Sequence, residues 1–168
     1  MMQIRTLVLF LVVVSLPAMA DDPGTAAIGR VIDDFHAAAA QGDKSRYLSH
    51  LTDDAVFMGT DEWERWPKQP DFVDYVGSRF KNGSGWNYRS VAREIRIADS
   101  GDMAWFDEVI FSEDSGRFRG TGVLVLQGDT WKIAHYAMSF LVFNENWQDV
   151  IELSKETRAM KERSSQEK

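Results

Sequence analysis

The second half of the chain contains four consecutive segments in which apolar residues recur at every second position. This period of two predicts β-strands, and the segments span residues 88–97, 103–111, 118–126 and 131–140. The connections between them are short and rich in glycine, serine and aspartate, so each strand should pair antiparallel with the one before it. Because no helix-length crossover separates the strands, a parallel α/β sheet is excluded.

Most of the remaining sequence has helical periodicity. Ile28, Val31, Ile32 and Phe35 recur at three- and four-residue spacing and predict a helix over 25–40. Further helices are expected over 43–51, 69–80 and 145–161, and a short strand over 55–58. The expected fold class is α+β: a cone-shaped, curved antiparallel sheet covered by N-terminal helices, plus a C-terminal helix.

The first twenty residues have the layout of a secretory signal peptide. Arg5 precedes an apolar run over 7–16, Pro17 breaks the run, and Ala18-Met19-Ala20 offers small residues to a signal peptidase. The run is shorter than the ~20 residues that cross a bilayer. We therefore expect a periplasmic or secreted protein, with a signal over 1–20, one domain over 21–144, and a helix with a polar tail over 145–168.

Composition limits the partners of the mature chain. Arg5 is the one charged residue of the signal, so 18 basic residues remain against 26 acidic ones, a net charge of −8. This charge repels phosphate backbones and anionic lipid, so we expect neither nucleic acid nor a membrane as a partner after signal removal. The chain has no cysteine, which rules out disulfides and thiolate catalysis.

The order of these elements resembles the nuclear transport factor 2-like superfamily, and within it the SnoaL-like branch. The resemblance covers roughly residues 26–143 and rests on "FHAAAAQGD" at 35–43, "LTDDAVFMGTDEWERW" at 51–66, "RGTGVLV" at 119–125 and "WKIAHYAMSF" at 131–140. It implies a cone-shaped barrel around a pocket, often a homodimer through the sheet. The superfamily includes cofactor-free isomerases, cyclases and dehydratases beside non-catalytic binding modules, so the fold leaves the function open.

Two strand residues are the candidates for proton transfer. His135 is in phase with apolar neighbours and titrates near neutral pH. Asp107 shares a strand face with Trp105, and an apolar setting raises a carboxyl pKa. Arg119, on the next strand, is expected to clamp a carboxylate-bearing ligand. The alternative is that Arg119 or Arg117 neutralises Asp107 in a structural cross-strand pair.

A second set of candidates surrounds the first predicted strand. Trp63 and Trp66 lie three apart among charged residues, and in a cone they would either line the pocket or seal its wide end. Asp61 and Arg65 would supply polar groups beside them. The remaining ligand-binding candidate is Tyr47. Tyr47 and Asp61 are also possible partners of His135 in proton transfer.

Three functions stay open at this point. They are a small-molecule-binding domain, a cofactor-free isomerase or lyase, and a non-catalytic assembly module. The sequence has no nucleophile elbow, phosphate loop, zinc signature or dinucleotide fingerprint, so we expect no metal and no cofactor. Strands 103–111 and 118–126 are apolar on both faces, which favours a homodimer through the sheet.

The signal interpretation gives a direct prediction. Protein recovered from the exported fraction of an expressing bacterium should begin at Asp21, because a signal peptidase cuts after the small residue Ala20. Amino-terminal sequencing or intact mass measures this. Soluble cytoplasmic protein that retains Met1 would contradict it.

Overall fold

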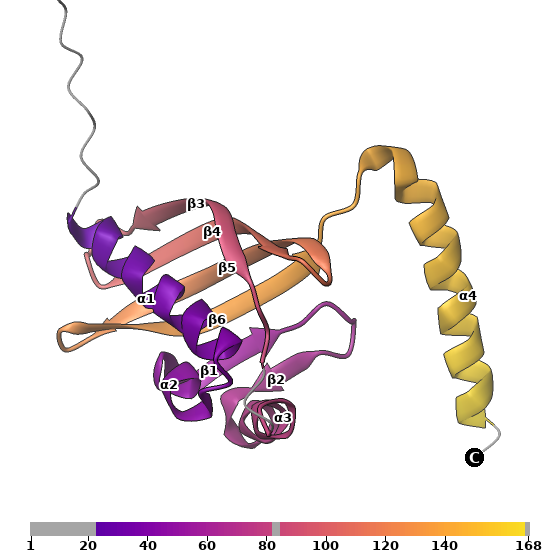
Figure 1. The fold of residues 1–168 in the computed structure, drawn as a ribbon, viewed down its shortest axis with the longest axis horizontal. Helices are drawn as coiled ribbons and strands as arrows, with labels where there is room; N and C mark the ends of the chain where they lie inside the picture. The colour runs from indigo at the N-terminus through magenta and orange to yellow at the C-terminus, as the bar shows by residue number, and fades with distance from the viewer. Residues whose placement is uncertain (1–22, 82–84, 167–168) are drawn as a thin grey trace, which may run out of the picture.

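A long first helix, α1 (Pro23–Ala40), packs across the inner face of a curved sheet (Figure 1). The computed structural model describes residues 23–81 and 85–166, so the predicted signal over 1–20 lies outside the described residues. The fully buried residues of α1 include Ile28, Ile32 and Phe35, the stripe that the sequence predicts. The stripe contacts β3 and β6, and its burial holds the helix on the sheet.

Short helices close the base of the cone. Helix α2 (Lys44–Ser49) begins at Asp43, whose side chain accepts a hydrogen bond from the backbone N–H of Arg46. The predicted helix over 69–80 consists of a π-helical turn, η1 (Lys68–Phe72), followed by α3 (Val73–Arg79). Phe72 and Val76 of this pair enter the core.

The sheet has six strands in the order β2-β1-β6-β5-β4-β3. The last four form the predicted antiparallel meander: β3 (Arg89–Ile97), β4 (Met103–Ser112), β5 (Gly116–Gln127) and β6 (Thr130–Phe140). The first strand, β1 (Leu51–Met58), is longer than predicted and pairs parallel with β6. The α+β class is therefore confirmed with a mixed sheet. The segment between β2 and β3 carries the chain to the opposite edge, and the meander then comes back to place β6 beside β1.

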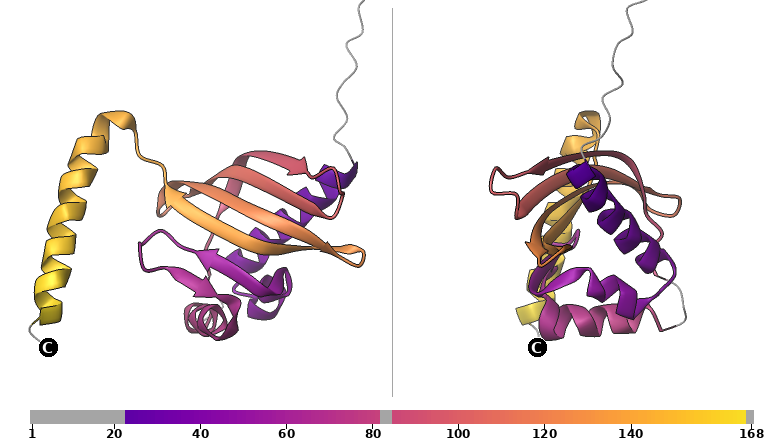
Figure 2. Two further views of the ribbon diagram at one scale, coloured as in Figure 1. Left: turned by 180° about the vertical axis from the view of Figure 1, so that it is seen from behind. Right: turned by 90° about the vertical axis from the view of Figure 1, so that its left-hand side faces the viewer.

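A short strand replaces part of the predicted loop. β2 (Arg65–Pro67) folds back on β1 as an antiparallel hairpin, with Trp66 opposite Phe57. Figure 2 shows this hairpin together with α1 and α3 on the concave side of the meander. The segment that the sequence left irregular is therefore an edge of the sheet.

Two glycines on the inner face of β5 make room for large side chains. A Cβ atom on Gly120 would lie 2.5 Å from the hydroxyl oxygen of Tyr136, and one on Gly122 would lie 2.5 Å from the ring of Phe106. Both distances are far below van der Waals contact. The glycines therefore let Tyr136 and Phe106 lie directly over the backbone of the neighbouring strand.

The C-terminal helix stands apart from the cone. After a 3-10 turn, η2 (Asn144–Asn146), helix α4 (Trp147–Gln166) extends beyond the sheet (Figures 1 and 2). Trp147 and Leu153 of this helix are exposed. The predicted helix is present and five residues longer at its end. None of the helices in the described ranges has the length and apolarity needed to span a membrane.

The outer sheet face is open in the single chain. Met103 and Trp105 of β4 are 43% and 47% exposed, and Val91 of β3 is 39% exposed. Over the described residues, α4 does not cover this face, since its contacts lie at η2 and the hairpin tip. The alternative in which the C-terminal helix shields the sheet is thereby removed, and we propose that a second copy shields it.

This proposal predicts a dimer at micromolar concentration. Light scattering should give twice the monomer mass, and Trp105→Lys should give the monomer because it places a charge in the apolar interface. Trp147→Lys is the matched control, since it changes an exposed tryptophan on α4 and should leave the dimer intact. A monomeric wild type would overturn the proposal.

Candidate functional site

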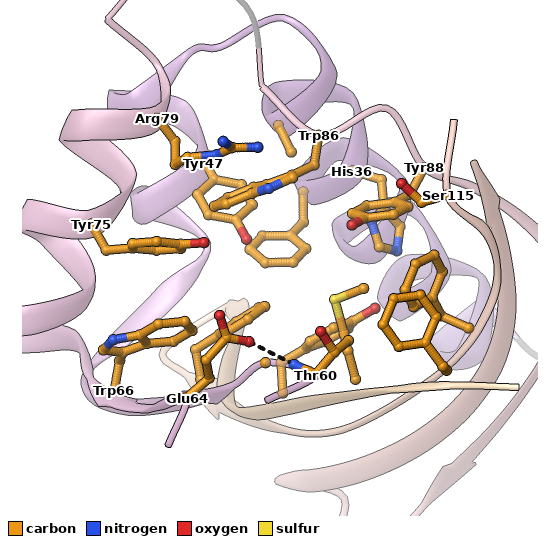
Figure 3. A pocket seen from close by; sticks show the side chains of 18 residues that line it. His36, Tyr47, Thr60, Glu64, Trp66, Tyr75, Arg79, Trp86, Tyr88 and Ser115 are labelled. Atoms are coloured by element: carbon orange, nitrogen blue, oxygen red, sulfur yellow. Dashed lines mark hydrogen bonds between the residues drawn. The ribbon is translucent and has the colours of Figure 1, made fainter. Parts of the chain in front are cut away.

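The cone encloses a cavity of about 210 Å³ lined by eighteen residues (Figure 3). Ten of the lining side chains are the rings of Phe35, Tyr47, Phe57, Trp66, Tyr75, Trp86, Tyr88, Phe118, Tyr136 and Phe140. They come from α1, α2, the β1–β2 hairpin, α3, the segment before β3, and strands β5 and β6. The enclosed aromatic cavity that the sequence predicts is present, although most of its lining differs from the predicted set.

The aromatic wall is held in fixed orientations by ring stacking. Trp66 of β2 stacks on Tyr75 of α3 with 4.4 Å between ring centroids, and Phe35 stacks on Tyr47 at 4.2 Å. Trp86 lies 5.7 Å from Tyr75 in a similar orientation. Such pairs stabilise one another beyond the area they bury, so the wall offers preformed flat surfaces.

The mouth of the cavity carries the exposed polar residues. Thr60, Arg79 and Ser115 are exposed, whereas the residues at the closed end are buried. Glu64 accepts hydrogen bonds from the backbone N–H groups of Thr60 and Asp61 at 2.8 and 3.1 Å, which folds the hairpin tip over the mouth. The guanidinium of Arg79 lies 5.9 Å from the ring centroid of Trp86.

At the closed end, two lining side chains meet a buried carboxylate. Glu108 of β4 is 1% exposed, and its Oε1 lies 2.7 Å from Nε2 of His36. The hydroxyl of Tyr136 donates to the same oxygen at 3.1 Å. Glu108 itself lies behind the cavity wall, so it acts on the cavity through His36 and Tyr136.

The second oxygen of Glu108 is also fully engaged. Nε and Nη2 of Arg93 donate to Oε2 at 3.0 and 2.9 Å. Nη1 of Arg93 continues to Asp33 of α1 at 2.8 Å. The result is a continuous network from the surface of α1 through the sheet to the cavity. Charge-assisted hydrogen bonds of this kind are strong enough to fix the geometry of every member.

The network determines the ionisation of its carboxylate. Burial by itself would raise the pKa of Glu108, but the hydrogen bond from His36 and the charges of His36 and Arg93 outweigh burial and hold the pKa below its ordinary value. Burial and the adjacent Glu108 raise the pKa of Tyr136 well above its ordinary value. Glu108 is therefore ionised and Tyr136 neutral at physiological pH.

An ionised Glu108 fixes the tautomer of His36. A carboxylate only accepts hydrogen bonds, so Nε2 of His36 must carry a proton toward it. In the neutral ring, Nδ1 is then the unprotonated nitrogen. A histidine oriented by a carboxylate and facing an apolar cavity can take up a proton or hydrogen-bond a ligand.

Of the predicted site residues, two line the cavity. Tyr47 and Trp66 are in its wall, and burial raises the pKa of Tyr47 well above its ordinary value. Trp63 is 63% exposed at the hairpin tip, where Asp61 pairs with Lys161 of α4, and Arg65 is exposed on β2. These three residues surround the mouth side of the hairpin and lie outside the cavity lining.

The other predicted residues occupy the outer face of the sheet. Trp105, Asp107 and His135 line an open hollow on that face, away from the cavity. Arg119 forms an ion pair with Asp107 at 3.6 Å, which is the cross-strand alternative that the sequence left open. The expectation that these four residues line the cone is corrected, because β4 turns the other face, with Phe106 and Glu108, inward.

Sequence reasoning missed the His36 and Glu108 pair. Glu108 is in phase with the apolar residues Ala104, Phe106 and Ile110, and a carboxylate in that position needs buried partners. Glycine at position 120, directly opposite Glu108, was a second signal. His36 lies on the buried side of α1, but only the folded chain brings it to β4.

In the described ranges, no group of three or more histidine, cysteine, aspartate or glutamate residues is arranged to hold a metal ion. The carboxylate of Glu108 is instead occupied by four donors from the protein itself.

Comparison with known families matches residues 28–143 to a SnoaL-like domain. The chain belongs to the SnoaL-like family. The match begins inside α1 and ends just after β6, so it contains the whole cavity lining and excludes α4. No curated protein matches the sequence.

Solved structures share this fold at low sequence identity. An NTF2-like protein from Pseudomonas putida KT2440 is 17% identical, with a TM-score of 0.60 over 72% of this chain and 89% of its own. A candidate ketosteroid isomerase from Shewanella frigidimarina is 21% identical, with a TM-score of 0.56 over 70% and 98%. A protein with a cystatin-like fold from Caulobacter vibrioides is 18% identical, with a TM-score of 0.59 over 79% and 99%. Such likeness establishes the fold alone.

The buried network predicts a large effect of a small change. Glu108→Gln should lower the free energy of unfolding by about 3–5 kcal/mol, because the neutral amide leaves the buried guanidinium of Arg93 without its carboxylate partner. Urea denaturation at pH 7 measures this. Glu113→Gln, in the exposed turn after β4, is the control and should change stability by less than about 0.5 kcal/mol.

The same variant should also show a characteristic pH dependence. The pKa of Glu108 is lowered by folding, so its contribution is present above its ordinary value of 4.5 and is lost as the pH falls through the folded-state pKa. The stability difference between wild type and Glu108→Gln should therefore shrink as the pH is lowered below about 4.5. A constant difference down to pH 3 would mean that Glu108 is not ionised.

Proposed function

We propose that this protein binds a small ring-containing molecule inside the cone. The observation that carries the proposal is the enclosed aromatic cavity with an oriented His36 at its closed end. Small-ligand sites are concave, largely apolar and equipped with a few fixed polar groups. A cavity of about 150 Å³ holds a benzene molecule, so about 210 Å³ suits one substituted ring.

The lining also suggests how such a ring is oriented. The stacked pair of Trp66 and Tyr75 forms part of the aromatic wall, while His36 offers a hydrogen-bonding nitrogen at the closed end. A ring with a hydroxyl group that donates to Nδ1 of His36 uses both the aromatic wall and this nitrogen. The hollow cone supports this proposal over an assembly module, whose cone would be filled by side chains.

A second candidate function is cofactor-free proton transfer, as in an isomerase or lyase. The observation that favours it is the Glu108 carboxylate behind His36, because this arrangement fixes the tautomer and stabilises the imidazolium that forms when His36 accepts a proton. His36 and Glu108 take the place that the sequence gave to His135 and Asp107. One fold neighbour is described as a candidate ketosteroid isomerase.

The predicted signal peptide adds a compartment to the proposal. An exported domain would bind its ligand in the periplasm or outside the cell. The motivation is the order of Arg5, the apolar run over 7–16 and Ala18-Met19-Ala20.

Binding is tested with single-ring probes. Titration calorimetry with p-cresol and with 3-cyclohexenone should give saturable binding to the wild type. Trp66→Ala should weaken it by about tenfold, because it removes one stacking surface worth roughly 0.5–1.5 kcal/mol together with its buried area. Trp105→Phe is the matched control on the outer face and should leave the affinity unchanged. Absence of binding by any single-ring probe would contradict the proposal.

One variant separates the two functions. His36→Gln keeps a hydrogen-bonding side chain, so binding alone predicts a modest change in affinity. If His36 transfers protons, the rate at which the wild type converts 3-cyclohexenone to 2-cyclohexenone should fall by roughly 10²–10⁴-fold in the variant. NMR in D₂O follows both the conversion and the incorporated deuterium. A wild type that binds the ketone without accelerating its isomerisation would leave binding as the function.

A further inference from the structure

A second cavity lies between the β1–β2 hairpin tip and α4. Its volume is about 540 Å³, and the apolar side chains along it are Trp63, Phe140, Val150 and Leu153. Figure 1 shows the hairpin directed toward α4 across this space. The residues of α4 lie beyond the matched family domain at 28–143, so this groove is an addition of this chain to the cone.

The groove is continuous with the mouth of the cone. Thr60 and Phe140 line both cavities. Thr60 belongs to the hairpin tip that Glu64 holds in place, and Phe140 ends β6 with 54% of its surface exposed. The mouth of the cone and the groove therefore adjoin at these two residues.

Ion pairs on the far side of the groove hold its two walls together. Arg158 of α4 pairs with Glu62, and Lys161 pairs with Asp61 at 3.4 Å. Lys161 also lies 5.5 Å from the ring centroid of Trp63. These contacts use the charged groups that border the groove. The apolar surface of the groove stays available to a bound molecule, since Trp63 and Leu153 are each 63% exposed.

We propose that the natural ligand is an amphiphile with a ring-containing head and an unbranched alkyl tail. The head occupies the cone, and the tail leaves between Thr60 and Phe140 and lies along the groove against Trp63 and Leu153. This proposal rests on the proposed function of the cone. Each methylene that leaves water on full burial raises affinity by about fourfold, so an open groove should yield about twofold per methylene.

A series of 4-alkylphenols tests the tail. For the full mature chain, affinity measured by titration calorimetry below the micelle concentration should rise about twofold per methylene from p-cresol to 4-hexylphenol. Leu153→Gln should lower the affinity for 4-hexylphenol by at least tenfold while changing that for p-cresol by less than twofold. Ile151→Gln is the matched control, because this half-buried residue of α4 lies outside the groove lining.

The outcomes separate this inference from the one on which it depends. If p-cresol binds and chain length adds nothing, the tail site is wrong and the cone site stands. If the gain with chain length survives in Leu153→Gln, the tail lies elsewhere and the inference is overturned. If no phenol binds at any length, the proposed function fails together with it. If Leu153→Gln changes the oligomeric mass, a second copy occupies the groove and the inference is overturned.

Discussion

The interaction on which this structure depends is the buried carboxylate of Glu108 and its four donors. Glu108 sits on β4, and its partners come from α1, β3 and β6. An ionised group at 1% exposure is tolerated only when its lone pairs are satisfied, so all three neighbours must be in place at once. The same condition explains Gly120, since a side chain there would displace the Tyr136 hydroxyl. The network therefore fixes how the first helix crosses the sheet and orients His36 toward the cavity.

Much of the fold follows from periodicity, because four adjacent strands with short turns leave few alternatives. Periodicity does not show which face of β4 points into the cone. Trp105 and Asp107 on one face match Phe106 and Glu108 on the other in residue type, so alternation defines two faces without saying which meets the helices. Opposing residues on β5 offered a way to decide: Gly120 and Gly122 stand where large neighbours need room, and that requirement arises inside the cone. The predicted site residue Asp107 lies one position before Glu108 on β4. Because successive strand residues point to opposite faces, Asp107 and Trp105 lie on the outer face of the sheet.

Long-range pairing explains the remaining differences. The parallel contact of β1 with β6 joins residues about eighty positions apart, and no local pattern encodes it. The hairpin that forms β2 separates the two tryptophans of the charged segment: Trp66 faces Phe57 and the cavity, while Trp63 at the tip is exposed beside α4. Their spacing is visible in the sequence, but their separate environments depend on where the hairpin edge falls. The family assignment, by contrast, follows from local segments and is confirmed over residues 28–143.

The Asp33, Arg93 and Glu108 network has a consequence for the charge of the cone. Glu108 and Arg93 form a buried pair of opposite charges, whereas the Asp33 carboxylate is 67% exposed and is screened by water. In the proposed proton transfer, the imidazolium formed on His36 would lie 2.7 Å from the ionised Glu108. The anion left on the ligand then lies next to the imidazolium. That imidazolium would be flanked by two negative groups, Glu108 and the ligand anion, which lowers the electrostatic cost of ionising a weak acid in the cavity.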